Sequence, residues 1–157
     1  MSDKISLIIP AKNEVESLGA VLEEVKNNKF VDEIIVVVDS EIDNSIPIVK
    51  KFNCKLIIQN QKGYGSAIIE GFKNAKNNFG CIYNADHSFD PKYLEELIRL
   101  SKSNDFIFGS RYKGSGGSDD DDIITFIGNK IFTFITRFIL GIKSVSYTHL
   151  TLPTNLS

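Results

Sequence analysis

Short apolar runs alternate with amphipathic stretches along most of the chain. The runs are rich in Ile and Val and too short for helices, which predicts buried strands. They cover residues 5–9, 34–38, 55–58, 81–83 and 105–108. The second run, Ile34 to Val38, is apolar at every position. We therefore expect it to be covered on both faces, as strands of a parallel sheet are.

Between these runs, apolar residues recur at steps of three and four, as on one face of a helix. The first such stretch runs from Val15 to Val25, and Asn13 with Glu16 predicts a loose capping box at its start. Further helices are expected within residues 46–52, 63–77 and 91–103.

Strand and helix thus alternate five times. This order is typical of an α/β fold with a mostly parallel sheet, right-handed crossovers and helices on both faces. Ligands of such folds bind beyond the carboxyl ends of the strands. The residues at these ends are mostly polar or Gly, at positions 10–14, 39–45, 60–65, 84–90 and 109–112. The chemistry of the protein is therefore expected there.

Composition narrows the class of protein. A length of 157 residues allows one domain, and a net charge of −2 argues against nucleic acid as a partner. Cys54 and Cys81 are isolated and suit a reducing cytoplasm. The N-terminal apolar run ends at Pro10 and is too short for a signal peptide. No run of about 18 apolar residues predicts a membrane span.

Five polar blocks follow the expected strands. They are Pro10-Ala11-Lys12-Asn13-Glu14, Asp39 to Ser45, Lys62 to Ala67, Asn84-Ala85-Asp86 and Gly109-Ser110-Arg111-Tyr112. In this order and spacing they resemble the family 2 glycosyltransferases with a GT-A fold, and the dolichol-phosphate mannose synthase branch in particular. The resemblance covers roughly residues 4–144. It implies a domain that uses a UDP- or GDP-sugar and inverts the anomeric carbon.

By this resemblance, Pro10, Ala11, Asn13 and Glu14 line the pocket for the base and ribose of the nucleotide. The plain alternative is a strand stop followed by a helix cap.

Asp39 and Asp43 resemble the second and last acids of the family's loop after the second strand. Val38, Ser40 and Glu41 depart from the pattern of that loop. Asp43 can equally cap the next helix.

Lys62, Gly63 and Gly65 precede a helix. The N–H groups and dipole at a helix N-terminus favour a diphosphate, and Lys62 adds a positive charge. The spacing fits neither a Walker A loop nor a dinucleotide fingerprint.

Asn84, Ala85 and Asp86 stand where the family has its Asp-x-Asp metal motif. The resemblance implies Mg²⁺ or Mn²⁺ as cofactor, with Asp86 as the catalytic carboxylate and metal ligand. Mg²⁺ binds through one or two carboxylates plus substrate phosphates, so Asn84 does not exclude a metal. His87 is expected to be structural or solvated, and Asp90 to bind ligand or to cap the next helix.

Arg111 has the planar fork that suits phosphate, and the resemblance implies that it contacts a phosphate of donor or acceptor. The alternative is a surface ion pair. The acids at 119–122 are expected to be solvated loop residues. The apolar helix expected over 123–142 fits either a membrane interface or the core.

The sequence changes character after Ser144. Residues 145–157 lack both the periodicity and the motifs of what precedes them, and they look like a translated sequencing adapter. We therefore expect a partial catalytic domain at 1–144, incomplete at its C-terminal side and inactive in transfer as it stands, and a non-native tail at 145–157.

The function expected from the sequence is sugar transfer to a polyprenyl phosphate at the cytoplasmic face of the inner membrane, by a protein peripheral to or anchored there. A phosphate acceptor is already anionic and needs no general base. One alternative is a family 2 enzyme that acts on a hydroxyl in polysaccharide or glycolipid synthesis and needs such a base. Another is a nucleotide-binding α/β domain without catalysis.

Overall fold

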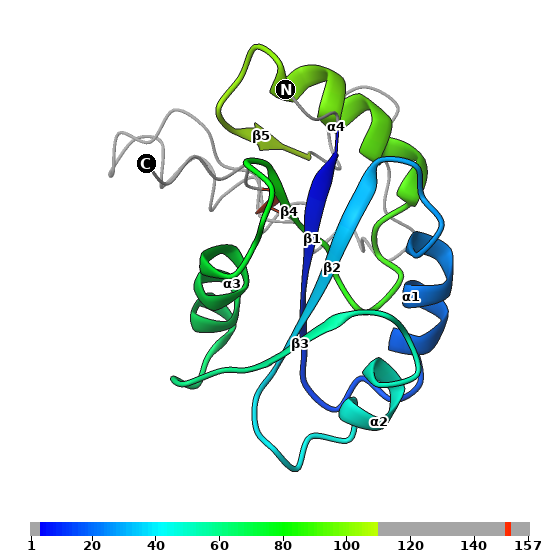
Figure 1. Cartoon of the computed structure of the whole chain (residues 1–157), viewed down its shortest axis with the longest axis vertical. Helices are drawn as coiled ribbons and strands as arrows, with labels where there is room; N and C mark the ends of the chain where they lie inside the picture. Colours follow the sequence, from blue (N-terminus) through cyan, green and yellow to red (C-terminus); the bar gives the residue numbers. More distant parts are fainter. Residues whose placement is uncertain (1–3, 110–149, 152–157) are drawn as a thin grey trace, which may run out of the picture. The chain divides into compact units, whose positions relative to one another are not determined.

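The computed structural model describes residues 4–109 and 150–151. Its elements alternate between strand and helix, as the sequence predicts (Figure 1). In chain order they are β1 (Ile5–Ala11), α1 (Leu18–Val25), β2 (Val31–Val38), α2 (Ile46–Val49), β3 (Lys55–Ile58), α3 (Tyr64–Lys73), β4 (Gly80–Ile82), the 3₁₀ turn η1 (Pro91–Tyr93), α4 (Leu94–Ser101), β5 (Ile107–Phe108) and β6 (Leu150–Thr151). The α/β class is confirmed.

Four strands form one parallel sheet in the order β3-β2-β1-β4. The chain first adds β2 and β3 on one side of β1 and then places β4 on its other side. Ile8 of β1 therefore pairs with Ile35 of β2 and with Ile82 of β4. The reversal makes the carboxyl ends of β1 and β4 the topological switch point, where open α/β sheets bind ligands.

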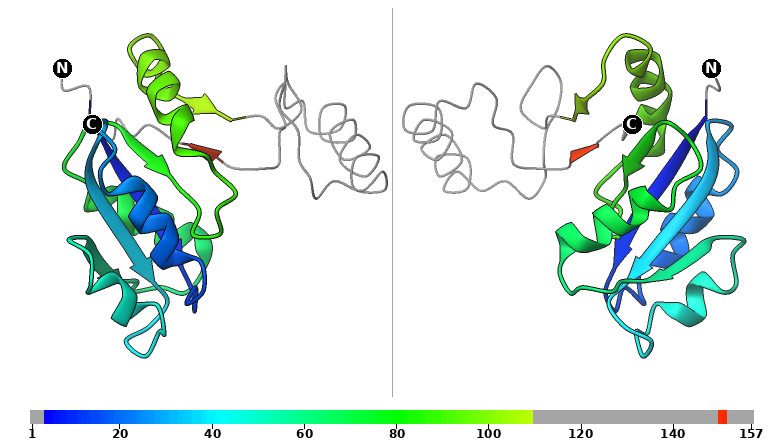
Figure 2. Two further views of the ribbon diagram at one scale, coloured as in Figure 1. Left: turned by 90° about the vertical axis from the view of Figure 1, so that its right-hand side faces the viewer. Right: turned by 60° about the vertical axis from the view of Figure 1, so that its left-hand side comes forward.

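Helices cover both faces of this sheet (Figure 2). Leu7 and Ile9 of β1 face the side that α1 and α4 cover, whereas Ile8 faces α3. Because successive strand residues alternate between two covered faces, the central strands need apolar residues throughout. α3 packs closely on β1, because a Cβ at Gly71 would clash with Cγ2 of Ile8.

The N-terminal ends of the strands are fixed by a polar network. The buried Ser6 hydroxyl donates to a Glu33 carboxylate oxygen over 2.7 Å. Asn77, just before β4, donates to the Ser6 oxygen, and the Lys76 N–H donates to Glu33. These bonds connect the segment between α3 and β4 to β1 and β2, at the N-terminal ends of the strands and opposite the polar blocks.

The prediction of a capping box at Asn13 is wrong. α1 begins at Leu18, after Ser17, and Asn13 has a left-handed backbone with φ of 57°. The N–H groups of Asn13 and Glu14 donate to side chains of the β2–α2 loop, so the chain runs through a turn before the helix starts.

The cap predicted at Asp90 is present. Its carboxylate accepts the Lys92 N–H at 2.9 Å and starts η1. The fifth predicted strand is shorter than expected, and β5 pairs with β6 in a separate two-stranded sheet.

Several predicted features lie outside the described residues. These are Arg111, the acids at 119–122, the helix at 123–142 and the predicted tail at 145–157 except Leu150 and Thr151. Among residues 4–109 and 150–151, no helix is long and apolar enough to cross a membrane.

Candidate functional site

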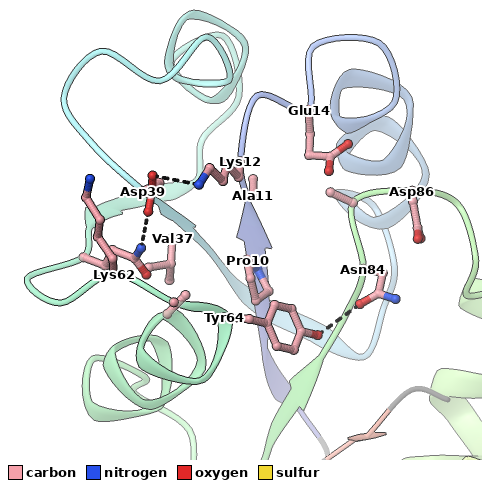
Figure 3. A pocket seen from close by; sticks show the side chains of 14 residues that line it. Pro10, Ala11, Lys12, Glu14, Val37, Asp39, Lys62, Tyr64, Asn84 and Asp86 are labelled. Carbon is pink, nitrogen blue, oxygen red and sulfur yellow. Dashed lines mark hydrogen bonds and ion pairs between the residues drawn. The ribbon is translucent and has the colours of Figure 1, made fainter. Parts of the chain in front are cut away.

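A pocket of about 630 Å³ lies at the carboxyl edge of the parallel sheet (Figure 3). The residues that line it come from β1, β2, α3 and the segments after the four strands. They are Pro10, Ala11, Lys12 and Glu14 at and after the end of β1, Val37 and Asp39 at and after the end of β2, Gln59, Lys62 and Gly63 between β3 and α3, Tyr64 and Ala67 of α3, and Asn84, Ala85 and Asp86 after β4. Each strand of the sheet contributes residues from its carboxyl end or from the segment that follows it, the place where open α/β folds bind ligands.

The structure brings most of the predicted site residues to this pocket. Those at its wall are Pro10, Ala11, Glu14, Asp39, Lys62, Gly63, Asn84, Ala85 and Asp86. Asn13, Asp43 and Gly65 are not among the lining residues, and Arg111 lies outside the described residues. Sequence reasoning did not assign the remaining lining residues to the site: Lys12, Val37, Gln59, Tyr64 and Ala67. Gln59 had a usable signal, because it directly follows β3.

One side of the pocket is organised around Asp39 (Figure 3). Its carboxylate forms an ion pair with the Lys12 ammonium at 3.2 Å and accepts the Gln59 amide N–H at 2.7 Å. The bond and charge of Lys12 hold the pKa of Asp39 below its usual value, against a smaller effect of burial. Asp39 is therefore ionised at neutral pH.

Asp43 lies in the same loop and contacts backbone rather than the pocket. Asp43 is 6% exposed, and its carboxylate accepts the N–H of Asn13 at 3.2 Å and that of Ser45 at 2.8 Å. The buried Ser45 hydroxyl oxygen accepts the Glu14 N–H at 2.9 Å. Asp43 and Ser45 thus hold the loop after β1 against the loop after β2. These bonds fix the position of the segment that carries Lys12 and Glu14 at the pocket.

The N-terminus of α3 forms another wall. Gly63 has a φ of 121°, which side-chain-bearing residues rarely adopt, and this turn brings the first helical residues to the pocket. The first N–H groups of a helix have no acceptor within the helix. They offer positive potential to an anion such as a diphosphate, and Lys62 adds a positive charge to the same pocket.

Tyr64 and Asn84 face each other across the pocket (Figure 3). The Tyr64 hydroxyl lies 3.4 Å from the Asn84 carbonyl oxygen, to which it donates. Burial and the negative charge of Asp86 raise the pKa of Tyr64, so its hydroxyl keeps its proton. Asn84 in turn donates to the Ser88 hydroxyl oxygen at 3.0 Å.

The loop that carries Asp86 is held in place by hydrogen bonds of its own residues. Tyr83 is buried after β4, and its hydroxyl donates to the Phe89 carbonyl oxygen at 2.7 Å. Asp86 is exposed at the pocket, and one of its oxygens accepts the Ser88 N–H. The loop thus presents this carboxylate from a fixed backbone.

These residues fit a divalent cation of the Mg²⁺ type. Asp86 offers carboxylate oxygen and Asn84 an amide oxygen, and Mg²⁺ takes such ligands together with phosphates and water. The described residues contain no group of three or more His, Cys, Asp or Glu side chains that could hold a metal by themselves. A metal here would therefore need phosphate oxygens from the ligand.

Comparisons with known proteins show the family of the chain. Residues 6–151 match the model of glycosyl transferase family 2. The chain is similar to a dolichol-phosphate mannosyltransferase of Pyrococcus furiosus, with 31% identity over 72% of this chain and 34% of the relative. It is also similar to a UDP-N-acetylglucosamine–dolichyl-phosphate N-acetylglucosaminyltransferase of Methanococcus voltae, with 30% identity over 90% of this chain and 65% of the relative. The chain spans between one third and two thirds of the length of these two relatives.

Solved structures share the fold. Glucosyl-3-phosphoglycerate synthase of Mycobacterium tuberculosis, in complex with Mg²⁺ and UDP, superposes with a TM-score of 0.71 at 16% identity, over 96% of this chain and 56% of that one. The same enzyme with Mn²⁺, UDP-glucose and phosphoglyceric acid gives a TM-score of 0.69. At this identity the likeness shows a GT-A-like fold. The family match extends past the predicted boundary at residue 144, which stays a prediction. On the match of residues 6–151, the chain belongs to glycosyl transferase family 2.

Proposed function

We propose that the protein moves a sugar from a UDP- or GDP-sugar to a polyprenyl phosphate. The observation that carries this is the placing of an exposed carboxylate, Asp86, and the N-terminus of α3 on one pocket at the switch point of the sheet. One feature attracts a cation and the other an anion. A metal-bound diphosphate satisfies both, and a nucleoside-diphosphate sugar carries one.

The donor would extend along the carboxyl edge of the sheet. Its base and ribose would lie toward Asp39 and the end of β3, and its diphosphate toward Lys62, the α3 N-terminus and Asp86. When bound, Mg²⁺ or Mn²⁺ supplies positive charge against the diphosphate as it leaves. Tyr64 retains its proton, and its hydroxyl would donate to a phosphate oxygen on turning away from Asn84.

The transfer is a single displacement. An oxygen of the acceptor phosphate forms a bond to the anomeric carbon while the bond from that carbon to the nucleoside diphosphate breaks, so the configuration inverts. Because the acceptor oxygen is already anionic, no side chain has to remove a proton from it. A phosphate, of donor or acceptor, is the proposed contact of Arg111.

The names of the two relatives support a lipid phosphate acceptor, since one name contains dolichol phosphate and the other dolichyl phosphate. Such an acceptor resides in a membrane, so the site would work at a membrane surface, at the cytoplasmic face where nucleotide sugars are found. Action on a hydroxyl acceptor and nucleotide binding without catalysis are the rivals.

Calorimetry with UDP and GDP, with and without Mn²⁺, tests the donor. We expect one nucleotide to bind at least about tenfold more tightly with the metal, which is about 1.4 kcal/mol. A labelled-sugar assay on the longest natural form of the gene product then compares a polyprenyl phosphate with the matching polyprenol. Product from the polyprenol would favour the hydroxyl class, and nucleotide binding without any product would favour a binding domain.

A further inference from the structure

Glu70, a residue of α3, bonds to the loop that leads into this helix. One of its carboxylate oxygens accepts the backbone N–H of Asn60 at 2.7 Å, and the other accepts the side-chain amide of Asn60 at 3.1 Å. Asn60 stands just past the end of β3, because the N–H of Gln59 still donates to the Val38 carbonyl oxygen. Glu70 therefore connects the point at which the chain leaves the sheet to the body of α3.

The loop that Glu70 holds is short and belongs to the pocket. Only Gln61, Lys62 and Gly63 lie between Asn60 and the first residue of α3. Lys62 and Gly63 line the pocket, whereas Glu70 does not. An effect of Glu70 on a ligand must therefore pass through this loop or through the charge of its carboxylate.

Packing does little to hold the loop in place. Residues 60–65 are exposed, and a Cβ at Gly63 would meet no atom within 4 Å. Gly63 is also the N-cap residue of α3, so no side chain caps the helix there. Among the residues that the structure describes, Glu70 is the only one whose side chain forms hydrogen bonds to residues 60–63. These two bonds are therefore the main side-chain restraint on the path of the loop.

The charge of Glu70 is unfavourable for the ligand proposed above. Glu70 lies about 9 Å along the helix axis from Tyr64, and its carboxylate would repel a diphosphate at the N-terminus of α3. A role through charge therefore predicts that removal of Glu70 tightens diphosphate binding. A role through the loop predicts the opposite, because the ligand would then have to order the loop as it binds.

We propose that Glu70 is a positioning residue for the diphosphate, which it does not touch. By holding Asn60, it fixes the turn at Gly63 and so places Lys62 and the first N–H groups of α3 at the pocket before a ligand binds. This inference rests on the proposed function, because it presupposes a nucleoside diphosphate in the pocket. It adds a residue outside the pocket on which the affinity for that ligand depends.

The bonds of Glu70 should matter for the diphosphate and not for the nucleoside part of the ligand. The base and ribose are proposed to lie toward Asp39, which Lys12 and Gln59 hold through contacts of their own. The diphosphate is proposed to meet Lys62 and the start of α3, which the loop places. Loss of Glu70 should therefore weaken the binding of UDP or GDP but not that of uridine or guanosine.

The test compares Glu70→Ala with Glu70→Gln, and Glu96→Ala is the control. Glutamine has no charge but keeps an oxygen for the Asn60 N–H, and its amide can donate to the Asn60 carbonyl oxygen after that amide turns over. Glu96 is an exposed residue of α4 outside the pocket.

Calorimetry with Mn²⁺ measures the affinity for UDP and GDP, and NMR titration measures that for uridine and guanosine. Glu70→Ala should weaken binding of the preferred diphosphate about fivefold and leave binding of its nucleoside unchanged. Glu70→Gln should bind the diphosphate as tightly as the unchanged chain or more tightly, since it keeps the bonds and loses the charge. Glu96→Ala should bind both ligands like the unchanged chain.

A second variant, Asn60→Ala, tests the same bonds without a change in α3. It removes the side-chain bond to Glu70 and keeps the backbone bond, so it should weaken diphosphate binding less than Glu70→Ala does. Combined with Glu70→Ala it should add nothing, because the bond is already lost.

Three results would overturn the inference and leave the proposed function standing. Tighter diphosphate binding in both Glu70 variants would assign the effect to charge. Equal losses for diphosphate and nucleoside would assign it to a general loss of structure. Unchanged diphosphate binding in Glu70→Ala, or in Asn60→Ala if only that variant folds, would show that the loop does not depend on these bonds. If neither UDP nor GDP binds the unchanged chain, the proposed function fails, and this inference with it.

Discussion

Asp39 and Asp43 lie four residues apart in the loop after β2, yet the structure gives them opposite tasks. Asp39 lines the pocket, and its partners are the side chains of Lys12 and Gln59. Asp43 is buried, and its partners are backbone N–H groups of its own loop and of the loop after β1. The difference shows that one acidic motif can contain both a ligand-facing group and the group that supports it.

The largest expected effect comes from removing the supporting carboxylate. Asp43→Ala leaves the N–H groups of Asn13 and Ser45 without their acceptor in a buried place. It should lower the free energy of unfolding by about 3 kcal/mol, measured by urea denaturation. The matched variant Asp39→Ala should leave the urea midpoint nearly unchanged and should weaken UDP or GDP binding instead. Equal stability losses in the two variants would remove the contrast between the two acids.

A second comparison sets the β2 side of the pocket against the β4 side. If Asp86 holds the metal, Asp86→Ala should abolish the Mn²⁺-dependent gain in nucleotide affinity, about tenfold or more. Its stability should change little, because the side chain is exposed. Asn84→Asp should keep or strengthen metal-dependent binding, since it adds a second carboxylate.

The control for Asp86 is Glu95→Ala, which removes an exposed carboxylate of α4 outside the pocket. Calorimetry with and without Mn²⁺ should show no change for this variant. Unchanged metal dependence in Asp86→Ala would show that Asp86 does not bind the metal. A similar loss in Asp86→Ala and Glu95→Ala would show that the effect comes from the net charge of the protein rather than from one site.

The fold could be predicted from the sequence because it depends on short-range patterns. The apolar run from Ile34 to Val38 predicts a strand that is covered on both faces. In the structure this run lies in β2, and its side chains divide between the two cores on opposite faces of the sheet. The position of the pocket followed from the same pattern. The split between Asp39 and Asp43 did not, because it depends on how two loops dock.

Two errors have the same physical origin. Asn13 looks like a helix cap in its local sequence, but its N–H is used by Asp43, 30 residues away, and the helix starts later. Gln59 has no motif of its own, and its place in the pocket comes from the register of β3 against Val38. Contacts between segments far apart in the sequence leave no local pattern to detect.

A smaller effect tests the clamp from its other member. Ser45→Ala removes the acceptor of the Glu14 N–H and should cost about 1 kcal/mol of unfolding free energy. Because Asp43 and Ser45 hold the same pair of loops, the double variant should lose less than the sum of the two single changes. Strict additivity in a urea-denaturation cycle would show that the two bonds act independently.

The smallest expected effect is the pKa of Asp39. Lys12 is the main cause of its lowered pKa, with Gln59 and Lys62 contributing less. Lys12→Met should therefore raise the Asp39 pKa toward the ordinary 3.8, whereas Lys62→Met should raise it less. A carboxylate whose pKa is lowered in the folded state stabilises the fold when the pH is above its pKa in the unfolded chain. This contribution is lost as the pH falls through the lowered pKa of the folded state. The pH dependence of stability should therefore differ between Lys12→Met and the unchanged chain only over a narrow range, from the lowered pKa up to about pH 4. Titration of the Asp39 carboxyl carbon by NMR measures the pKa directly. An unchanged Asp39 pKa in Lys12→Met would mean that the hydrogen bond from the Gln59 amide, rather than the lysine, lowers this pKa.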